Sequence, residues 1–324
     1  MNRTGREGPE GRERQEGRVG RVRLPRREDL VNVLEFEEPA KLTLSAPVYA
    51  TIAGGDRAGF DRITFRPRMM VPTLDLEMGV ELFGDSLFTP IVVGPVADQR
   101  RYHADGELAT VLGASAARTA VMISSRSSVP LRDLLAAAKT PLWFSAYADG
   151  DARKAIDQAA AAGCRTVCIS IEPGGKPNWR RIESIRRGLD ANILIKGVMT
   201  AEDAKAALDQ GAKGIVVSDH GGADEDKTMP IDVVGSIVDT VAGKATVLVD
   251  GSFRRGSDIA KALALGARGV LLARPVMWGL AAYGADGVQN VLEMLQGDLA
   301  RNMGALGAPS LAGLTRAMIK VHTR

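Results

Sequence analysis

The sequence predicts an α/β fold, a (β/α)8 TIM barrel with an N-terminal extension. Three observations predict this fold class. From Thr89 onward, eight apolar runs alternate with eight segments of helical periodicity. The apolar runs are nearly continuous, which is typical of parallel strands that are buried on both faces. The units recur at intervals of roughly 25 residues, and eight of them suit the length of a closed barrel.

The individual elements follow in strict alternation along the chain. The predicted strands cover residues 90–96, 120–124, 142–147, 166–171, 192–198, 214–218, 246–250 and 269–273. The predicted helices cover residues 106–118, 131–138, 151–162, 179–189, 201–210, 231–241, 258–265 and 279–295. Several helices end at a glycine, as at Gly163, Gly211 and Gly266, because glycine readily adopts the positive φ of a C-cap. Strict alternation implies parallel strands that are joined by crossover helices.

A doubly wound open sheet is the competing fold. It usually has fewer strands, and no G-x-G-x-x-G motif follows an early strand of this chain. The barrel is therefore favoured, with the barrel proper at about residues 89–300. Before it, residues 30–88 form an extension in which Pro67 and Pro72 argue against a continuous helix. We expect residues 30–324 to form a single barrel domain with this extension packed on it.

The first 29 residues differ in composition from the rest. Residues 1–27 carry nine arginines and four glutamates, with several glycines and almost no apolar side chains. Such a segment cannot bury enough surface to offset its ordering entropy. We expect residues 1–29 to be a disordered tail.

Composition excludes several function classes. The net charge of +3 is too balanced to indicate nucleic-acid binding, and no run of about 18 apolar residues predicts a membrane span. Cys164 and Cys168 are four residues apart at one apolar run, too far from each other for a disulfide. Reduced, buried thiols are typical of a cytoplasmic protein, so this is the expected location.

Chemically apt side chains stand where the predicted strands end, which is the catalytic face of a barrel. His220 follows an apolar strand and precedes two glycines, although a lone histidine can also simply cap a strand. Lys196 leaves a buried strand, so its ammonium needs an anion or an electron-rich acceptor; a salt bridge to Glu172 or Asp250 is the alternative. Arg254 and Arg274 stand on the last two loops, where barrels commonly bind phosphate, although such arginines also pair with neighbouring acids.

Several blocks together carry a family resemblance. They are RPR (66–68), IKGV (195–198), EDA (202–204), VVSDHGG (216–222), DGSFRRGSD (250–258), ALALGA (262–267) and RP (274–275). In this order they make the chain similar to the FMN-dependent α-hydroxy-acid oxidases and dehydrogenases, the family of glycolate oxidase and lactate oxidase. The resemblance covers most of the chain from about residue 46.

The resemblance implies FMN as the cofactor, with no metal ion. Lys196 would lie beside N1 and C2=O of the flavin and stabilise negative charge on the reduced ring. Arg254, Arg274 and the Gly251 region would hold the phosphate, and Asp250 would bind the ribityl hydroxyls. The other positions expected to contact FMN are Pro95, Ala97, Ser124, Ser145, Ser170, Ser218, Ser252 and Ala273.

The resemblance also assigns catalytic roles. His220 would be the base that takes a substrate proton while a hydride equivalent moves to the flavin. Tyr147 would hydrogen-bond the substrate oxygen. Glu172 stands where the family has an aspartate that orients the histidine, and Lys196 completes the predicted catalytic set.

The substrate-binding positions depart from the family. Ala223 replaces an arginine that clamps the substrate carboxylate, and the loop that carries a second arginine is reduced to residues 173–177. Thr51 aligns with a substrate-binding tyrosine, although Tyr49 is close by. Alanine cannot replace bidentate guanidinium–carboxylate pairing. Arg126 either points into the pocket as a substitute or is a solvated loop residue.

Three functions remain open from the sequence. The first is an FMN-dependent oxidoreductase acting on CH–OH, with a substrate that the usual arginine pair does not hold. The alternatives are a flavin-binding barrel with little or no turnover and a non-redox flavin isomerase. A small molecule is the expected substrate, and the resemblance implies a homo-oligomer, commonly a tetramer in this family.

Overall fold

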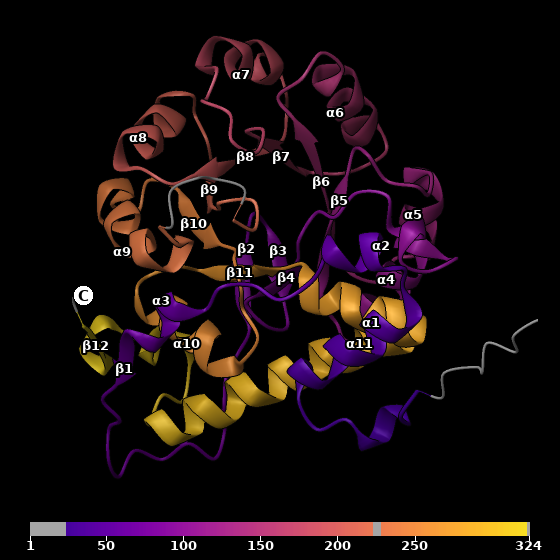
Figure 1. Ribbon diagram of the computed structural model, residues 1–324. Coiled ribbons are helices and arrows are strands. Elements are labelled where there is room, and N and C mark those ends of the chain that lie inside the picture. Colours follow the sequence, from indigo (N-terminus) through magenta and orange to yellow (C-terminus); the bar gives the residue numbers. More distant parts are fainter. Residues whose placement is uncertain (1–23, 223–227, 323–324) are drawn as a thin grey trace, which may run out of the picture.

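Eight parallel strands close into a barrel in the computed structural model, which describes residues 24–222 and 228–322 (Figure 1). Around the barrel the strand order is β10-β11-β4-β5-β6-β7-β8-β9, so neighbours along the chain are also neighbours in space. The predicted fold class is therefore confirmed. The barrel strands are β4 (Ile91–Val93), β5 (Ala120–Ser124), β6 (Leu142–Tyr147), β7 (Thr166–Ser170), β8 (Asn192–Val198), β9 (Gly214–Val217), β10 (Thr246–Val249) and β11 (Gly269–Leu272).

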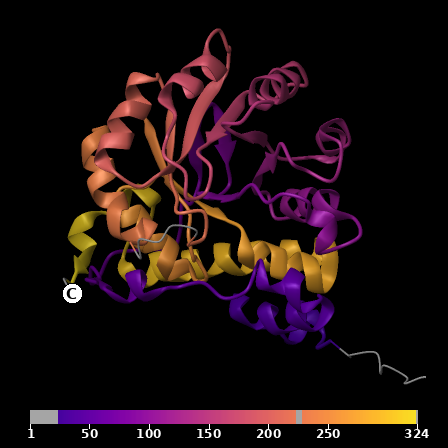
Figure 2. The same cartoon turned by 45° about the horizontal axis from the view of Figure 1, so that its top comes forward.

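Helices cover the outside of the barrel (Figures 1 and 2). Each turns an apolar stripe inward; in α6, for example, Ala152, Ile156 and Ala159 recur at helical spacing and are buried. Among the described helices, none has both the length and the apolar character that crossing a bilayer requires. The helices that follow the barrel strands are α4 (Gly106–Ala116), α5 (Leu131–Ala137), α6 (Ala152–Ala161), α7 (Trp179–Arg186), α8 (Ala201–Asp209), α9 (Pro230–Val241), α10 (Gly256–Ala264) and α11 (Arg274–Leu306).

Two elements differ most from their predicted bounds. Strand β4 ends at Val93 and not at residue 96, because Pro95 has no N–H to continue the ladder. Helix α11 begins at Arg274, immediately after the last strand, and it contains non-helical residues at Tyr283 and Gly284. The sequence predicted only residues 279–295, the middle of this helix, and it did not predict the kink.

The N-terminal extension packs on one side of the barrel. Figure 2 shows its helices beside α11, and α1 contacts α11 directly. Strand β1 of the extension pairs antiparallel with β12 near the C-terminus. The remaining elements are η1 (Arg27–Asp29), η2 (Val33–Phe36), α1 (Glu37–Thr43), α2 (Ala46–Ala50), α3 (Ala58–Asp61), β1 (Ile63–Phe65), β2 (Val80–Leu82), β3 (Asp85–Leu87), η3 (Gln99–Arg101), η4 (Leu311–Gly313), η5 (Arg316–Met318) and β12 (Ile319–Val321).

The segment expected to be a tail lies mostly outside the described residues, which begin at residue 24. The part that is described contacts α11. Arg27 pairs with Asp286 at 2.9 Å, and the hydroxyl of Tyr283 donates a hydrogen bond to the carbonyl of Pro25 at 2.9 Å.

The β2–β3 hairpin closes the amino-terminal end of the barrel. Its Val80, Leu82 and Leu87 share one buried cluster with inward side chains of the barrel strands. Trp143 of β6 lies in this cluster, and its indole N–H donates a hydrogen bond to Asp85 Oδ2 at 2.8 Å. Phe83 at the hairpin turn meets Trp143 edge to face, with the ring centroids 5.3 Å apart. The hairpin therefore makes the opposite, carboxyl-terminal end of the barrel the open one.

We expect Trp143→Ala to lower the free energy of unfolding by about 3–5 kcal/mol, because it empties a fully buried site in the barrel. Urea unfolding measures the loss. Trp143→Phe is the matched control: it keeps ring packing and removes only the indole hydrogen bond, so it should lose less than half as much. Equal losses for the two variants would contradict the packing account.

Candidate active site

A cavity of about 300 Å³ lies at the carboxyl ends of the barrel strands. Most residues that the sequence placed in the site line it, since in a parallel barrel all strands end on the same face. Those residues are Pro95, Ala97, Ser124, Ser145, Tyr147, Ser170, Lys196, His220, Asp250, Gly251, Ser252, Arg254, Ala273 and Arg274. The remaining predicted site residues, Arg126, Glu172 and Ser218, lie outside its lining.

A buried charge network lies under the cavity wall. Lys196 is only 5% exposed, and its Nζ lies 2.8 Å from Asp250 Oδ2. Ser218 sits between them: its Oγ accepts a hydrogen bond from Lys196 at 2.5 Å and donates one to Asp250 Oδ2 at 2.9 Å. The salt bridge considered for Lys196 thus forms with Asp250. The network joins the ends of β8, β9 and β10.

Two local backbone features bring His220 to this network. The β8–β9 register shifts between Lys196 and Val198, which marks a bulge at Gly197. Gly197 has a φ of 98°, and a Cβ on it would lie 2.9 Å from His220 Nε2. Only glycine therefore leaves room for the imidazole against the end of β8.

The histidine itself has a strained backbone, with a φ of 53°. Gly221 and Gly222 follow it with positive φ values of 84° and 91°. Asp219 secures this turn, because its Oδ1 accepts a hydrogen bond from the Gly221 N–H at 2.9 Å. Burial raises the pKa of the Asp219 carboxyl, against the lowering effect of that hydrogen bond. The His220 N–H donates to Ser218 Oγ at 3.2 Å, which ties the turn to the Lys196 network.

Tyr147 stands across from the histidine, at the end of β6. The centroids of the two rings are 6.2 Å apart. The guanidinium of Arg126 lies over the Tyr147 ring, 4.6 Å from the ring centroid. Arg126 also pairs with Asp149 at 3.2 Å and is about half exposed. It is therefore an ordered residue at the rim, neither inside the pocket nor freely solvated.

The other end of the cavity is cationic. The guanidinium of Arg254 is buried, stacks on Trp278 at 4.5 Å and donates a hydrogen bond to the Gly54 carbonyl at 2.5 Å. Arg274 donates to Ser252 Oγ at 3.0 Å. Burial and the charge of Arg274 lower the pKa of Arg254. Two guanidinium groups held together in this way form a site for an anion, because a negative charge offsets both the desolvation and the repulsion.

Two serine hydroxyls also line the cavity. Ser145 Oγ and Ser170 Oγ are 3.0 Å apart, and both are buried at the ends of adjacent strands. Cys168 lies behind them in the barrel, where burial raises the pKa of its thiol to about 11. Both cysteines are free and buried, as expected.

Other predicted residues lie away from the cavity. Glu172 is exposed, and its side chain forms no hydrogen bond or ion pair with any described residue. Its role as the partner of His220 stays a prediction. Ala223, the key departure at the substrate site, lies outside the described residues. Tyr49 donates a hydrogen bond to Glu37 at 3.0 Å and does not line the cavity.

Sequence reasoning missed two parts of the site. Tyr102 lines the cavity, and its hydroxyl lies 3.0 Å from Thr51 Oγ1, which puts a phenol near the position where the family tyrosine was expected. Gly54 and Gly55 bring the extension over the arginine pair, and a Cβ on Gly55 would lie 2.9 Å from Arg274 Cζ. The consecutive glycines were the available signal for this close approach.

Comparison with known proteins agrees with this geometry. The family model described as FMN-dependent dehydrogenase matches residues 50–173 and 170–321. The chain belongs to this family. It is 32% identical to 4-hydroxymandelate oxidase of Amycolatopsis orientalis, over 90% of this chain and 98% of that protein. It is 30% identical to a peroxisomal (S)-2-hydroxyacid oxidase of Arabidopsis thaliana, over 91% of this chain and 98% of that protein.

Solved structures give the same result for the fold. A crystal structure of mandelate oxidase with (S)-4-hydroxymandelic acid aligns with a TM-score of 0.86 and 30% identity, covering 91% of this chain and all of that chain. The family assignment makes the chain an oxidoreductase that acts on CH–OH with FMN as its cofactor. The compartment stays a prediction, since the relatives include peroxisomal enzymes.

The residues present fit FMN. Asp250 Oδ1 is buried and has no hydrogen-bond partner among the described residues, whereas Oδ2 is bound by Lys196 and Ser218. A free, buried acceptor beside a cavity suits a polyol hydroxyl donor. Arg254 and Arg274 suit a phosphate at the next position along the cavity. FMN carries a polyol chain that ends in a phosphate, so it presents both groups in the order in which Asp250 and the arginine pair occur along the cavity.

Inorganic phosphate should stabilise the FMN-free protein, because it neutralises the Arg254–Arg274 pair. At a phosphate concentration 100 times its Kd, the gain is about 2.7 kcal/mol. Thermal unfolding at constant ionic strength measures it. Arg274→Gln should remove most of the effect, whereas the control Arg301→Gln, on the exposed face of α11, should leave it. Equal stabilisation by chloride would show that the pair is no phosphate site.

Proposed function

We propose that this chain oxidises the CH–OH group of a small 2-hydroxy acid or related alcohol to a carbonyl, with His220 as the base. The proposal is supported above all by one observation: an imidazole, a phenol and a buried ammonium meet at one end of a cavity whose other end is a cationic anion site. A barrel that only stored flavin would have no use for a strained histidine at that position. The same feature favours oxidation over the two alternatives.

FMN, when bound, supplies the two-electron acceptor that the side chains lack. His220 accepts the proton that the substrate loses as its two electrons leave. Tyr147 donates a hydrogen bond to the substrate oxygen and so fixes the orientation of the reacting carbon. Lys196 holds a positive charge at the floor of the cavity, where reduction brings negative charge.

Arg126, at the rim of the cavity, is placed to bind the substrate. Arg126 is held over Tyr147 and is paired there with Asp149, which is itself about one-third exposed. Arg181 Nε donates to the Asp149 carbonyl at 3.2 Å, so the segment that carries the pair is anchored. A substrate carboxylate at the rim can replace Asp149 as the partner of Arg126. We therefore assign Arg126 the role of binding the substrate anion in place of the family arginines.

His220→Ala should lower the rate of anaerobic flavin reduction by about 10²- to 10⁴-fold, because the base is lost. Stopped-flow absorbance with a panel of hydroxy acids and neutral alcohols measures it. FMN content should stay unchanged, since the phosphate end is intact. His322→Ala is the matched control, because the His322 ring bonds Thr64 just after β12 and does not line the cavity. Reduction at the wild-type rate in His220→Ala would remove the proposed base.

Arg126→Ala should raise KM for an anionic substrate by about 10- to 100-fold, the worth of one charged hydrogen bond, and should change kcat much less. A neutral alcohol of the same size should show no such rise. Asp149→Asn releases Arg126 from its partner, so it should lower KM for the anion. If both variants leave both KM values unchanged, Arg126 does not bind substrate.

A further inference from the structure

The three most exposed large apolar side chains in the described part of the chain lie within six residues. Met69 is 83% exposed, Met70 99% and Leu74 95%. They belong to residues 66–77, which we call the ridge loop. Isolated exposed apolar residues are ordinary on a protein surface, but a cluster of this kind marks a contact surface.

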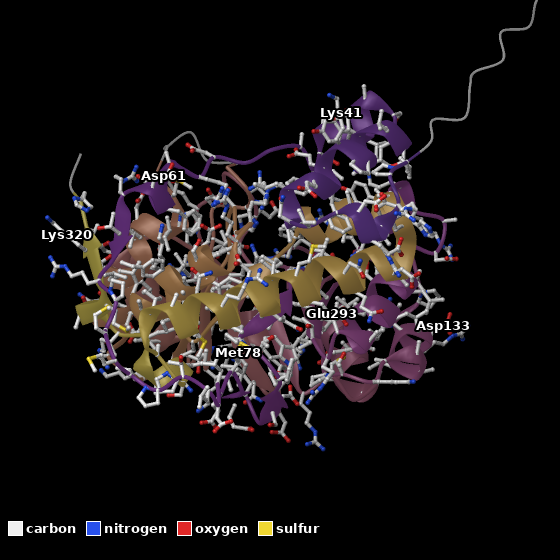
Figure 3. All side chains as sticks on the ribbon, turned by 90° about the horizontal axis from the view of Figure 1, so that it is seen from below. Lys41, Asp61, Met78, Asp133, Glu293 and Lys320 are labelled. Carbon is white, nitrogen blue, oxygen red and sulfur yellow. The ribbon has the colours of Figure 1, made fainter. Side chains whose placement is uncertain are left out.

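The ridge loop is held firmly at both ends. The Arg66 N–H donates to the Met318 carbonyl at 2.7 Å, and the Arg68 N–H donates to the Leu306 carbonyl at 3.0 Å. Farther along, the Glu77 N–H donates to the Pro309 carbonyl at 2.8 Å. In Figure 3 the chain between the labelled Asp61 and Met78 passes the C-terminal end of α11.

The loop also packs closely on α11. A Cβ on Gly307 would lie 2.6 Å from the Arg68 carbonyl oxygen and 3.2 Å from Val71 Cβ. Gly307 ends the helix with a φ of 67°, so the helix terminus and the loop fit each other. Met70 has a positive φ of 58°, which a non-glycine residue adopts only when its surroundings impose it. The apolar side chains are thus presented by an ordered backbone, and a partner has little ordering entropy to offset.

Charge is divided along the ridge loop. Arg66 and Arg68 precede most of the apolar residues along the loop, and Asp75 and Glu77 follow them; all four side chains are exposed. None of these four side chains forms a salt bridge within residues 24–222 and 228–322.

This pattern is complementary to itself. We propose that the ridge loop is a two-fold contact surface between two copies of this chain. In a two-fold contact, residue i of one copy meets residue j of the other, and j meets i. Two antiparallel loops place the arginines of each copy opposite the acids of its partner, with the methionines and Leu74 between them. An anionic lipid surface fits less well, because Asp75 and Glu77 would face it.

Sedimentation velocity on the full-length FMN-bound protein tests the proposal. Wild type should sediment as two copies or a multiple of two. The variants Arg66→Glu/Arg68→Glu and Asp75→Lys/Glu77→Lys should each sediment at half the wild-type mass or less, because two like-charged loops repel. Mixing the two variants should restore the wild-type mass, since an all-acidic loop then meets an all-basic one.

Met70→Glu should also halve the mass, and Val31→Glu, which alters an apolar residue that is 76% exposed outside the loop, should not. Circular dichroism and FMN content confirm that each variant is folded. A wild-type protein of single-copy mass, charge variants of unchanged mass, or a mixture that fails to recover would each overturn the proposal. So would a single-copy protein that co-sediments with phosphatidylcholine–phosphatidylserine vesicles through Met70. These results do not depend on turnover, so they leave the proposed oxidation untouched.

Discussion

The ion pair between Lys196 and Asp250 is the interaction on which the site depends. An ammonium that is almost removed from water costs several kcal/mol unless an anion and further hydrogen bonds compensate for it. Asp250 supplies the charge with one oxygen, and Ser218 supplies the hydrogen bond. Ser218 also accepts the backbone N–H of His220. One network therefore fixes the ends of three strands and the position of His220 relative to the Lys196 ammonium. Asp250 Oδ1, the second carboxylate oxygen, has no hydrogen-bond partner among the described residues, and a cofactor hydroxyl can donate to it.

Much of this arrangement could be predicted from the sequence, because barrel geometry turns position along the chain into position in space. A polar residue that follows an apolar parallel strand must reach the common rim, and Lys196, His220 and Asp250 do so. Contacts between distant segments follow no such rule. Gly55 meets Arg274 only because the extension folds over the arginines, and Tyr102 lies beside Thr51 of that extension; no local periodicity encodes either contact.

The interaction partners of long side chains could not be predicted from the sequence either. Arg126 was weighed as a pocket residue or a solvated one, and it is neither, because Asp149 and the Tyr147 ring hold it at the rim. The pairing depends on the direction of a flexible side chain, not on its position in the chain. The last helix is also longer than its sequence predicted. The expected helix covered residues 279–295, whereas α11 runs from Arg274 to Leu306 and contains non-helical residues at Tyr283 and Gly284.

The cavity is polarised along its length, and this limits how a substrate can lie. The arginine pair at one end is matched to a phosphate, so an anionic substrate that entered freely would be drawn there. A cofactor phosphate that neutralises this pair leaves the rim guanidinium of Arg126 as the exposed cation nearest to Tyr147. Binding of the cofactor then does more than supply an electron acceptor. It neutralises the competing anion site, so under the proposed role of Arg126 a substrate carboxylate would be directed to the end of the cavity where His220 and Tyr147 stand.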